Sequence, residues 1–269
     1  MKLIHITKNR SEKAGMTMEA VYILYITTAG LILGSFYNVV GMRLPAGESF
    51  IYPRSNCPKC GTALVAMELI PLFSYVLLKG KGKCCGTKLS PLYPLIEAAT
   101  AGLFVGAWLL YGFSWEFLSA VLFLSLLVII TVTDIRYMRI PDKILLFFGV
   151  MLVLLRVSTD RLEPWWDMAA GTAAGFFLLL LIGVVSKGGM GGGDIKLFAI
   201  IGLFFGWELT LVAFFLSVLL GAAAGLPGLV AGKVKRGVPI PFGPFIAAGS
   251  ILTLFWGRAL LDWYLKGMF

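Results

Sequence analysis

Two aspartates stand where long apolar runs of this chain are interrupted, with few other charges nearby. Asp134 follows a run that ends at Thr133, and Asp194 lies between the glycine-dense stretch 187–193 and another apolar run. An isolated ionised carboxylate at membrane depth is energetically expensive. Each aspartate must therefore lose its charge, pair with a cation or take part in chemistry.

The two carboxyl groups can act together if two helix ends bring them face to face. Close carboxylates in a poor dielectric share one proton and titrate as a coupled pair. The ionised member can accept a proton from a water that attacks an amide carbonyl, while the protonated member donates to the carbonyl oxygen, and the roles then exchange. The pattern thus predicts aspartyl proteolysis. The glycines at 191–193 would let backbone approach an extended peptide closely, and Asp194 would gain from the helix dipole.

Other interpretations of the same residues remain open. Asp134 can pair with Arg136 or Arg139, and Asp194 can cap its helix. Lys196 beside the glycines suggests a phosphate cradle, but the Gly-Lys-Ser/Thr order of a P-loop is missing. The alternative function is a proton- or cation-coupled transporter that uses the two aspartates, with the glycine break as a discontinuous helix. A purely structural scaffold leaves the paired carboxylates unexplained.

Composition identifies the solvent in which the chain folds. Of 269 residues, 59% are hydrophobic and 14% charged, and the mean hydropathy is +0.90. These values predict an all-α polytopic membrane protein surrounded by lipid. The net charge of +9 does not indicate nucleic acid, because the basic residues lie in short loops where they determine topology. The single histidine, His5, lies in a polar leader, which excludes catalysis by a buried histidine.

Eight apolar segments are predicted to be membrane helices. The segment at 195–205 is short for a full crossing. The expected borders are 20–41, 92–111, 117–133, 144–157, 168–185, 195–205, 209–231 and 240–261.

The predicted domains follow from these segments. Residues 1–18 form a polar leader that we interpret as not native to the fold, and residues 19–41 form the first transmembrane helix. Residues 42–91 form a small cysteine-rich insert, and residues 92–269 form a seven-helix membrane domain.

The loop charges predict the orientation. If the insert is cytoplasmic, the cations within 136–143, 187–196 and 233–236 share its side, whereas Glu116, the loop 160–167 and Glu208 face the other side. Both Asp134 and Asp194 then lie at the cytoplasmic membrane boundary.

Five sequence stretches, in order, resemble the motifs of bacterial type IV prepilin peptidases, which are GxGD-type intramembrane aspartyl proteases. They are 34–45, 90–98, 133–142, 189–197 and 239–245. The resemblance implies a bacterial inner-membrane enzyme that cuts the basic leader from prepilins or pseudopilins of type IV pili and type II secretion at the cytoplasmic face. It also implies N-methylation of the new N-terminus with S-adenosylmethionine.

The resemblance also assigns residues. Asp134 and Asp194 take the catalytic places, and a supporting set comprises Gly191, Gly193, Lys196, Pro241 and Gly243. Asp142 belongs to the family's pattern as well, but Ile140-Pro141-Asp142 also resembles an ordinary helix start. No GxGxxG after a strand is present, so a Rossmann-type methyl-donor site is not visible. Candidates for lining another methyl-donor site are Asn38, Glu68 and Glu97, although such residues also serve as helix-packing contacts.

The four cysteines predict a structural zinc site in the insert. Cys57-Pro-Lys-Cys60, followed by a glycine, is typical of a zinc knuckle, and a metal would let so small an insert fold. Cys84 and Cys85 are adjacent, whereas the family usually carries a second Cys-x-x-Cys, and Gly82 stands where its first cysteine would be. Three thiolates with another ligand, or a disulfide, are the alternatives, and a reducing cytoplasm argues against the disulfide.

Overall fold

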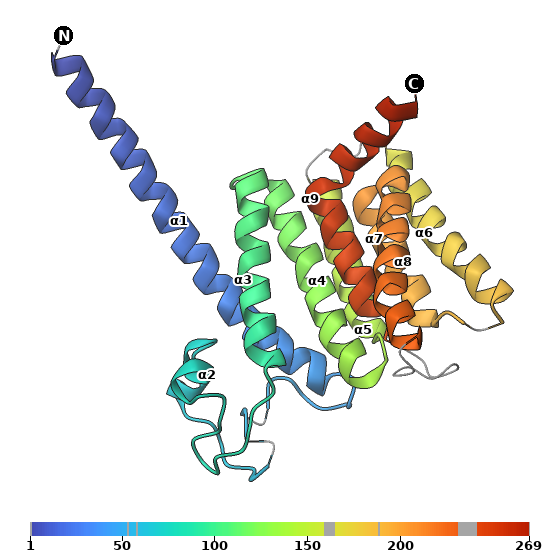
Figure 1. Cartoon of the computed structure of the whole chain (residues 1–269), viewed down its shortest axis with the longest axis horizontal. Coiled ribbons are helices and arrows are strands. Elements are labelled where there is room, and N and C mark those ends of the chain that lie inside the picture. The colour runs from blue at the N-terminus through green and yellow to red at the C-terminus, as the bar shows by residue number, and fades with distance from the viewer. Residues whose placement is uncertain are drawn as a thin grey trace. The chain divides into compact units, whose positions relative to one another are not determined.

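The computed structural model describes residues 2–52, 54–57, 59–158, 165–187, 189–230 and 241–268. Within these ranges the chain is almost entirely helical, with two isolated antiparallel bridges, Asn56–Ala63 and Lys81–Lys88. The elements in Figure 1 are α1 (Lys2–Arg43), η1 (Ala66–Leu69), α2 (Phe73–Leu77), α3 (Leu92–Tyr111), α4 (Trp115–Tyr137), α5 (Asp142–Ser158), α6 (Trp165–Val185), α7 (Gly192–Phe205), α8 (Trp207–Val230) and α9 (Gly243–Met268).

All eight predicted membrane segments coincide with helices, namely α1 and α3 to α9. In the described part of the chain, six of them are long and apolar enough to cross a membrane: α1 from Met18 onward, α3, α4, α6, α8 and α9. The other two are shorter, with 17 residues in α5 and 14 in α7. The prediction of an all-helical, multi-pass membrane protein is therefore confirmed.

Some of the residues used to predict topology lie outside the described set. These are the cations Lys233, Lys235 and Arg236 and the loop residues 160–163. Residues 239–240, the first of the family-like stretch 239–245, also lie outside it. The backbone of the polar leader continues α1 from Lys2, but the side chains of residues 2–17 are also outside the described set.

The helices divide between two compact units, residues 1–38 with 51–109, and residues 39–50 with 110–269. In the first unit, α1 and α3 pack closely through small residues. A Cβ on Gly30 would lie 2.5 Å from the Cα of Ala101, and one on Gly34 would lie 2.8 Å from the Cα of Glu97. Small residues allow such close backbone approach between membrane helices, where lipid provides no hydrophobic driving force.

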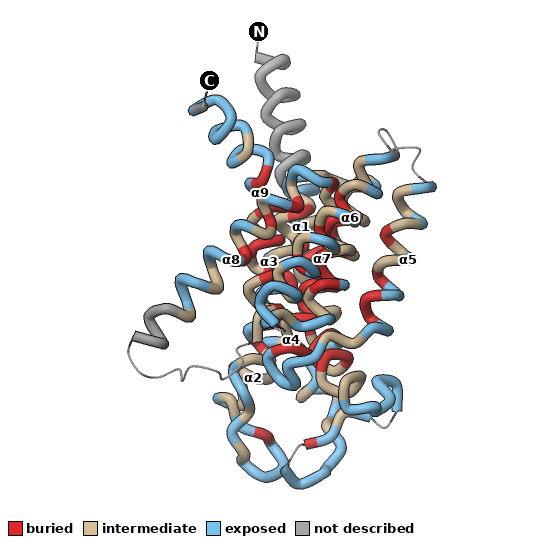
Figure 2. Tube along the Cα trace, turned by 90° about the vertical axis from the view of Figure 1, so that its right-hand side faces the viewer, coloured by how far each residue is buried: buried red, intermediate tan, exposed pale blue. Residues whose placement is uncertain are grey.

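The second unit is built around α4. Of the apolar window of α4, 67% is buried inside the protein, against 17–33% for the other five candidate spans. Helices α5 and α9 pack against it, and the buried residues of the chain are the red stretches of the tube in Figure 2. A helix that is apolar on every side belongs in the centre of a bundle. The last turn of α1 joins this unit, since the Tyr137 hydroxyl donates to the Met42 carbonyl at 2.8 Å.

Helix α7 is held in the same unit by backbone contact with α6. A Cβ on Gly202 would overlap the carbonyl oxygen of Gly171, and a Cβ on Gly175 would overlap the carbonyl oxygen of Phe198. These glycines bring the two helix backbones together. The short helix α7, which carries Asp194, is thereby fixed against a longer one.

Candidate active site

Asp134 lies in the last turn of α4, where the chain leaves the bundle. The helix ends at Met138, whose φ of 50° is left-handed and whose amide donates to the Asp134 carbonyl. Asp134 is buried, with only 6% of the residue exposed. Its Oδ2 accepts a hydrogen bond of 2.7 Å from the backbone amide of Gly243, the first residue of α9.

Because Gly243 has no side chain, the Asp134 carboxylate can reach its backbone amide. A Cβ there would lie 2.9 Å from Oδ2 and 3.0 Å from Cβ of Asp134. The suggested pairing of Asp134 with Arg136 or Arg139 does not occur among the described ion pairs. Pro241, which is half-buried, precedes Phe242, whose carbonyl accepts from the amides of Phe245 and Ile246 and so starts α9.

Asp194 lies in the first turn of α7. The N-cap position is occupied by Gly191, whose φ and ψ are extended, so Asp194 is not the cap itself. Burial raises the pKa of the Asp194 carboxyl to about 6, the nearby Asp134 adds to this rise, and a hydrogen bond from the Gly191 amide opposes it. Asp194 therefore holds its proton more tightly than an ordinary aspartate does.

The two aspartates line one pocket of about 600 Å³. Its walls come from the end of α1, the α4–α5 connection and the start of α7: Leu44, Pro45, Asp134, Met138, Arg139, Ile140, Pro141, Asp142, Lys143, Gly191, Gly192, Gly193 and Asp194. Two helix ends thus bring the carboxyl groups into a shared, partly enclosed space. That these two carboxyl groups act as a coupled pair stays a prediction.

The three glycines before Asp194 differ in their surroundings. A Cβ on Gly193 would lie 2.8 Å from Cβ of Ile140, whereas nothing lies within 4 Å of the corresponding position on Gly192. A Cβ on Gly191 would lie 3.0 Å from Oδ2 of Asp194. Gly193 therefore lets the α4–α5 connection lie against α7, while Gly192 leaves open space on the pocket wall.

Lys196 forms an ion pair that the sequence analysis did not predict. Its Nζ lies 2.8 Å from both carboxylate oxygens of Asp142. Asp142 is the first residue of α5 and Lys196 lies two residues after Asp194, so the pair links the starts of two helices. Both side chains are largely exposed, at 69% and 54%. An exposed pair adds little stability, so it contributes mainly by positioning.

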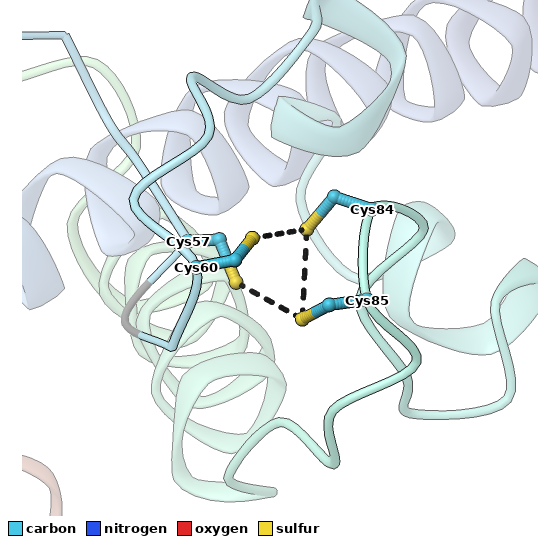
Figure 3. Close-up of side chains that lie close together, drawn as sticks. All are labelled: Cys57, Cys60, Cys84 and Cys85. Atoms are coloured by element: carbon cyan, nitrogen blue, oxygen red, sulfur yellow. Dashed lines mark hydrogen bonds between the residues drawn. The ribbon is translucent and has the colours of Figure 1, made fainter.

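The four cysteines meet in the first unit, as Figure 3 shows. The Sγ–Sγ distances are 3.7 Å for Cys57–Cys85, 3.2 Å for Cys60–Cys84 and 3.8 Å for Cys84–Cys85. All four ligand atoms lie within 4.8 Å of one another. The thiols are free, so the disulfide alternative is not realised, and the cluster is able to hold a metal ion.

The residues suggested for methyl transfer also belong to the first unit, but each already holds a backbone group. Asn38 Nδ2 donates to the Tyr93 carbonyl at 3.2 Å. Glu97 accepts from the Leu72 amide at 2.7 Å, and Leu72 has a left-handed φ of 60°. Glu68 accepts from the Val65 amide at 3.0 Å. These contacts are those of residues that fix helices and turns.

Comparisons with known proteins agree with this architecture. Residues 28–111 match the bacterial peptidase A24 N-terminal domain, and residues 121–226 match the type IV leader peptidase family. No solved structure matches the chain.

Curated relatives extend the match over most of the chain. The prepilin leader peptidase/N-methyltransferase of Bacillus subtilis (strain 168) is 46% identical over 237 residues, covering 88% of this chain and 95% of the relative. Proteins of the same name from Aeromonas salmonicida (strain A449) and Stutzerimonas stutzeri are each 33% identical, over 91% of this chain and 94% of the relative. The resemblance drawn from the five motifs is thus confirmed, and the chain belongs to the type IV leader peptidase family of bacteria.

Proposed function

We propose that this protein is a membrane-embedded aspartyl endopeptidase that removes the leader of type IV prepilins or pseudopilins at the cytoplasmic face of the bacterial inner membrane. The observation that carries the proposal is the placement of Asp134 and Asp194 in one pocket at two helix ends. Relatives covering most of the chain are named as prepilin leader peptidases and N-methyltransferases. Nothing in the structure or among the relatives favours the transporter alternative.

The two carboxyl groups divide the acid and base roles. The Gly243 amide hydrogen bond stabilises the ionised form of Asp134, and burial raises the pKa of Asp194 above that of an ordinary aspartate, so we assign Asp134 as the base and Asp194 as the acid. Asp134 then accepts a proton from the water whose oxygen attacks the scissile carbonyl carbon, and Asp194 donates its proton to the carbonyl oxygen. In the second step, Asp134 returns its proton to the leaving nitrogen, Asp194 recovers a proton from the tetrahedral intermediate, and the C–N bond breaks.

N-methylation would follow cleavage, with S-adenosylmethionine supplying the methyl group to the new terminal amine. Asn38, Glu68 and Glu97 are our candidates for lining the donor site, and they also bond the backbone groups of Tyr93, Val65 and Leu72. We derive no methyl-transfer step through them.

The cysteine cluster fits a zinc ion with a structural role. Four thiolates bound tetrahedrally at about 2.3 Å from zinc lie about 3.8 Å apart, close to the observed 3.7 and 3.8 Å separations. Hydrogen bonding with Thr62 is the main cause that lowers the pKa of Cys60 to about 6, whereas the hydrogen bond with Cys60 is the main cause that raises the pKa of Cys84 to about 12. Gly86, with a φ of 64°, allows the turn that follows the adjacent cysteines. Zinc would hold together a segment with little regular secondary structure.

Replacement of either catalytic aspartate tests the proposal directly. Asp134→Asn and Asp194→Asn are each expected to reduce cleavage of a prepilin at least about a thousandfold, because each removes one of the two proton-transfer groups. Asp142→Asn is the matched control, since Asp142 lines the same pocket but pairs with Lys196. Its activity should stay within about tenfold of the parent.

The assay compares initial cleavage rates in detergent, with folding of each variant checked by thermal unfolding. Retained cleavage in both Asn variants of the catalytic pair would show that these aspartates are structural.

The glycines provide a second, steric test. Gly193→Ala should lower kcat strongly, because its Cβ would meet Ile140 at 2.8 Å and displace the segment that carries Asp194. Gly192→Ala should cleave like the parent, since its Cβ would meet nothing within 4 Å. Both substitutions lie in the first turn of α7, so helix propensity affects them alike. Equal loss in the two variants would refute this account of the glycine loop.

Metal analysis of purified protein tests the zinc proposal. We expect about one equivalent of zinc per chain, and loss of most of it in Cys57→Ser. Thr62→Val, which replaces only the hydroxyl that contacts Cys60 at 3.3 Å by a methyl group, should retain the stoichiometry and lose about tenfold in affinity. Undamaged parent protein with less than half an equivalent would contradict a structural zinc site.

A further inference from the structure

Beside the aspartate pocket lies a second hollow, of about 700 Å³, along α5 and α7. Its lining is almost entirely apolar and includes Leu146, Gly149, Val150 and Leu154 of α5, Ile200 of α7 and Phe176 of α6. We refer to it as the α5–α7 groove. Because α5 and α7 pack against the membrane-length helices α4 and α6, the groove lies at membrane depth.

The groove adjoins the aspartate pocket, since the two share lining residues. Asp142 and Lys143, at the start of α5, line both hollows. Lys196 lines the groove, and its partner Asp142 lines both the groove and the aspartate pocket. Their ion pair therefore lies at the border between the two hollows. A peptide held between Asp134 and Asp194 can therefore extend from the aspartate pocket into the α5–α7 groove.

Two polar links join the helices that border the groove. The Asp142–Lys196 pair joins the helix starts at 2.8 Å, and Arg156 Nη1 donates to the Phe204 carbonyl at 3.1 Å near the other end. Between these links, Gly149 has no side chain, and a Cβ there would approach only Ile200, at 3.6 Å. Leu146 and Leu154, which line the groove, are 70% and 52% exposed.

The chemistry of the groove restricts what can occupy it. A peptide in an apolar environment at membrane depth must satisfy its own backbone hydrogen bonds, so it must be helical there. Recognition of an apolar helix by an apolar groove is a common binding mode, with anchors spaced at three or four residues. On the groove wall, Leu146, Val150 and Leu154 repeat at that spacing along α5.

We infer that the α5–α7 groove binds the apolar helix of the substrate that follows the scissile bond, while the extended segment before it enters the aspartate pocket. This inference rests on the proposed peptidase function and adds to it the site that selects helical membrane substrates. The groove walls act through the apolar helix, so they affect substrate binding more than the chemical step.

A photo-crosslinking experiment tests where the substrate helix lies. A benzoylphenylalanine is placed at Leu146 or Val150 in full-length Asp194→Asn protein, which binds but does not cut, and the protein is mixed with full-length prepilin in vesicles. The matched control position is Phe147, which is 56% exposed on the same helix but does not line the groove. We expect prepilin adducts at Leu146 and Val150, with at most about one tenth as much at Phe147.

The outcomes separate the possible occupants. Adducts that contain only lipid or only a second copy of this chain, or equal prepilin adducts at all three positions, would overturn the inference.

Kinetics of cleavage provide the second arm. Leu146→Trp and Gly149→Leu fill the groove and should raise KM for full-length prepilin about tenfold with little change in kcat, whereas Phe147→Trp should match the parent. Unchanged KM in both groove variants would contradict the inference while leaving the peptidase function intact. Failure of the parent protein to cleave any prepilin would instead overturn the proposed function, and the inference with it.

Discussion

The hydrogen bond from the Gly243 amide to Asp134 joins parts of the chain that are 109 residues apart in sequence. It fixes the start of α9 against the end of α4, the most deeply buried of the candidate membrane helices. At membrane depth, both the carboxylate and the first amide of a helix need a partner. Here the Gly243 amide and the Asp134 carboxylate are each other's partner, so the position of the Asp134 carboxylate depends on how α9 packs against α4.

The geometry of the pocket depends on places where a side chain is absent. Gly243 leaves room for the Asp134 carboxylate, and Gly193 leaves room for the α4–α5 connection. Gly171 and Gly202 bring α6 and α7 into backbone contact, which holds the short helix that carries Asp194. The proposed catalytic pair is thus positioned by helix ends, which support proton transfer better than loops do.

The short helices α5 and α7 border both the aspartate pocket and the α5–α7 groove. They are linked by an ion pair at one end and by an arginine–carbonyl contact at the other. The aspartate pocket opens near their starts, and an apolar groove follows their length. One site can therefore receive water for hydrolysis and a substrate from the lipid phase.

Much of this could be predicted from the sequence, because long apolar runs in a membrane protein have few structural solutions. The helices, the two aspartates at helix ends and the cluster of four cysteines followed from residue type and spacing. The partners of those residues did not. The Asp134–Gly243 and Asp142–Lys196 contacts join residues that only the folded bundle brings together.

One interpretation failed for a local physical reason. Asp194 does not cap its helix, because the cap is Gly191 and α7 begins two residues before the aspartate. The assignment of Asn38, Glu68 and Glu97 to a methyl-donor site stays a prediction, and each of them also bonds a backbone group. A polar residue near a membrane helix end satisfies the backbone as readily as it binds a ligand, and sequence alone does not distinguish the two.

The central claim, that Asp134 and Asp194 share one proton, is tested most directly by titrating the carboxyl groups with infrared difference spectroscopy on aspartate-labelled protein. The account predicts two separated steps for the pair, with the upper step near pH 6, where the Asp194 pKa lies. Below that pH the pair keeps its shared proton, and above it the proton is lost. In Asp134→Asn the remaining Asp194 step should move to lower pH, because the charge that opposed its ionisation is gone. An Asp194 step that stays in place when Asp134 is replaced, or a pair that titrates together like ordinary aspartates, would contradict the shared proton.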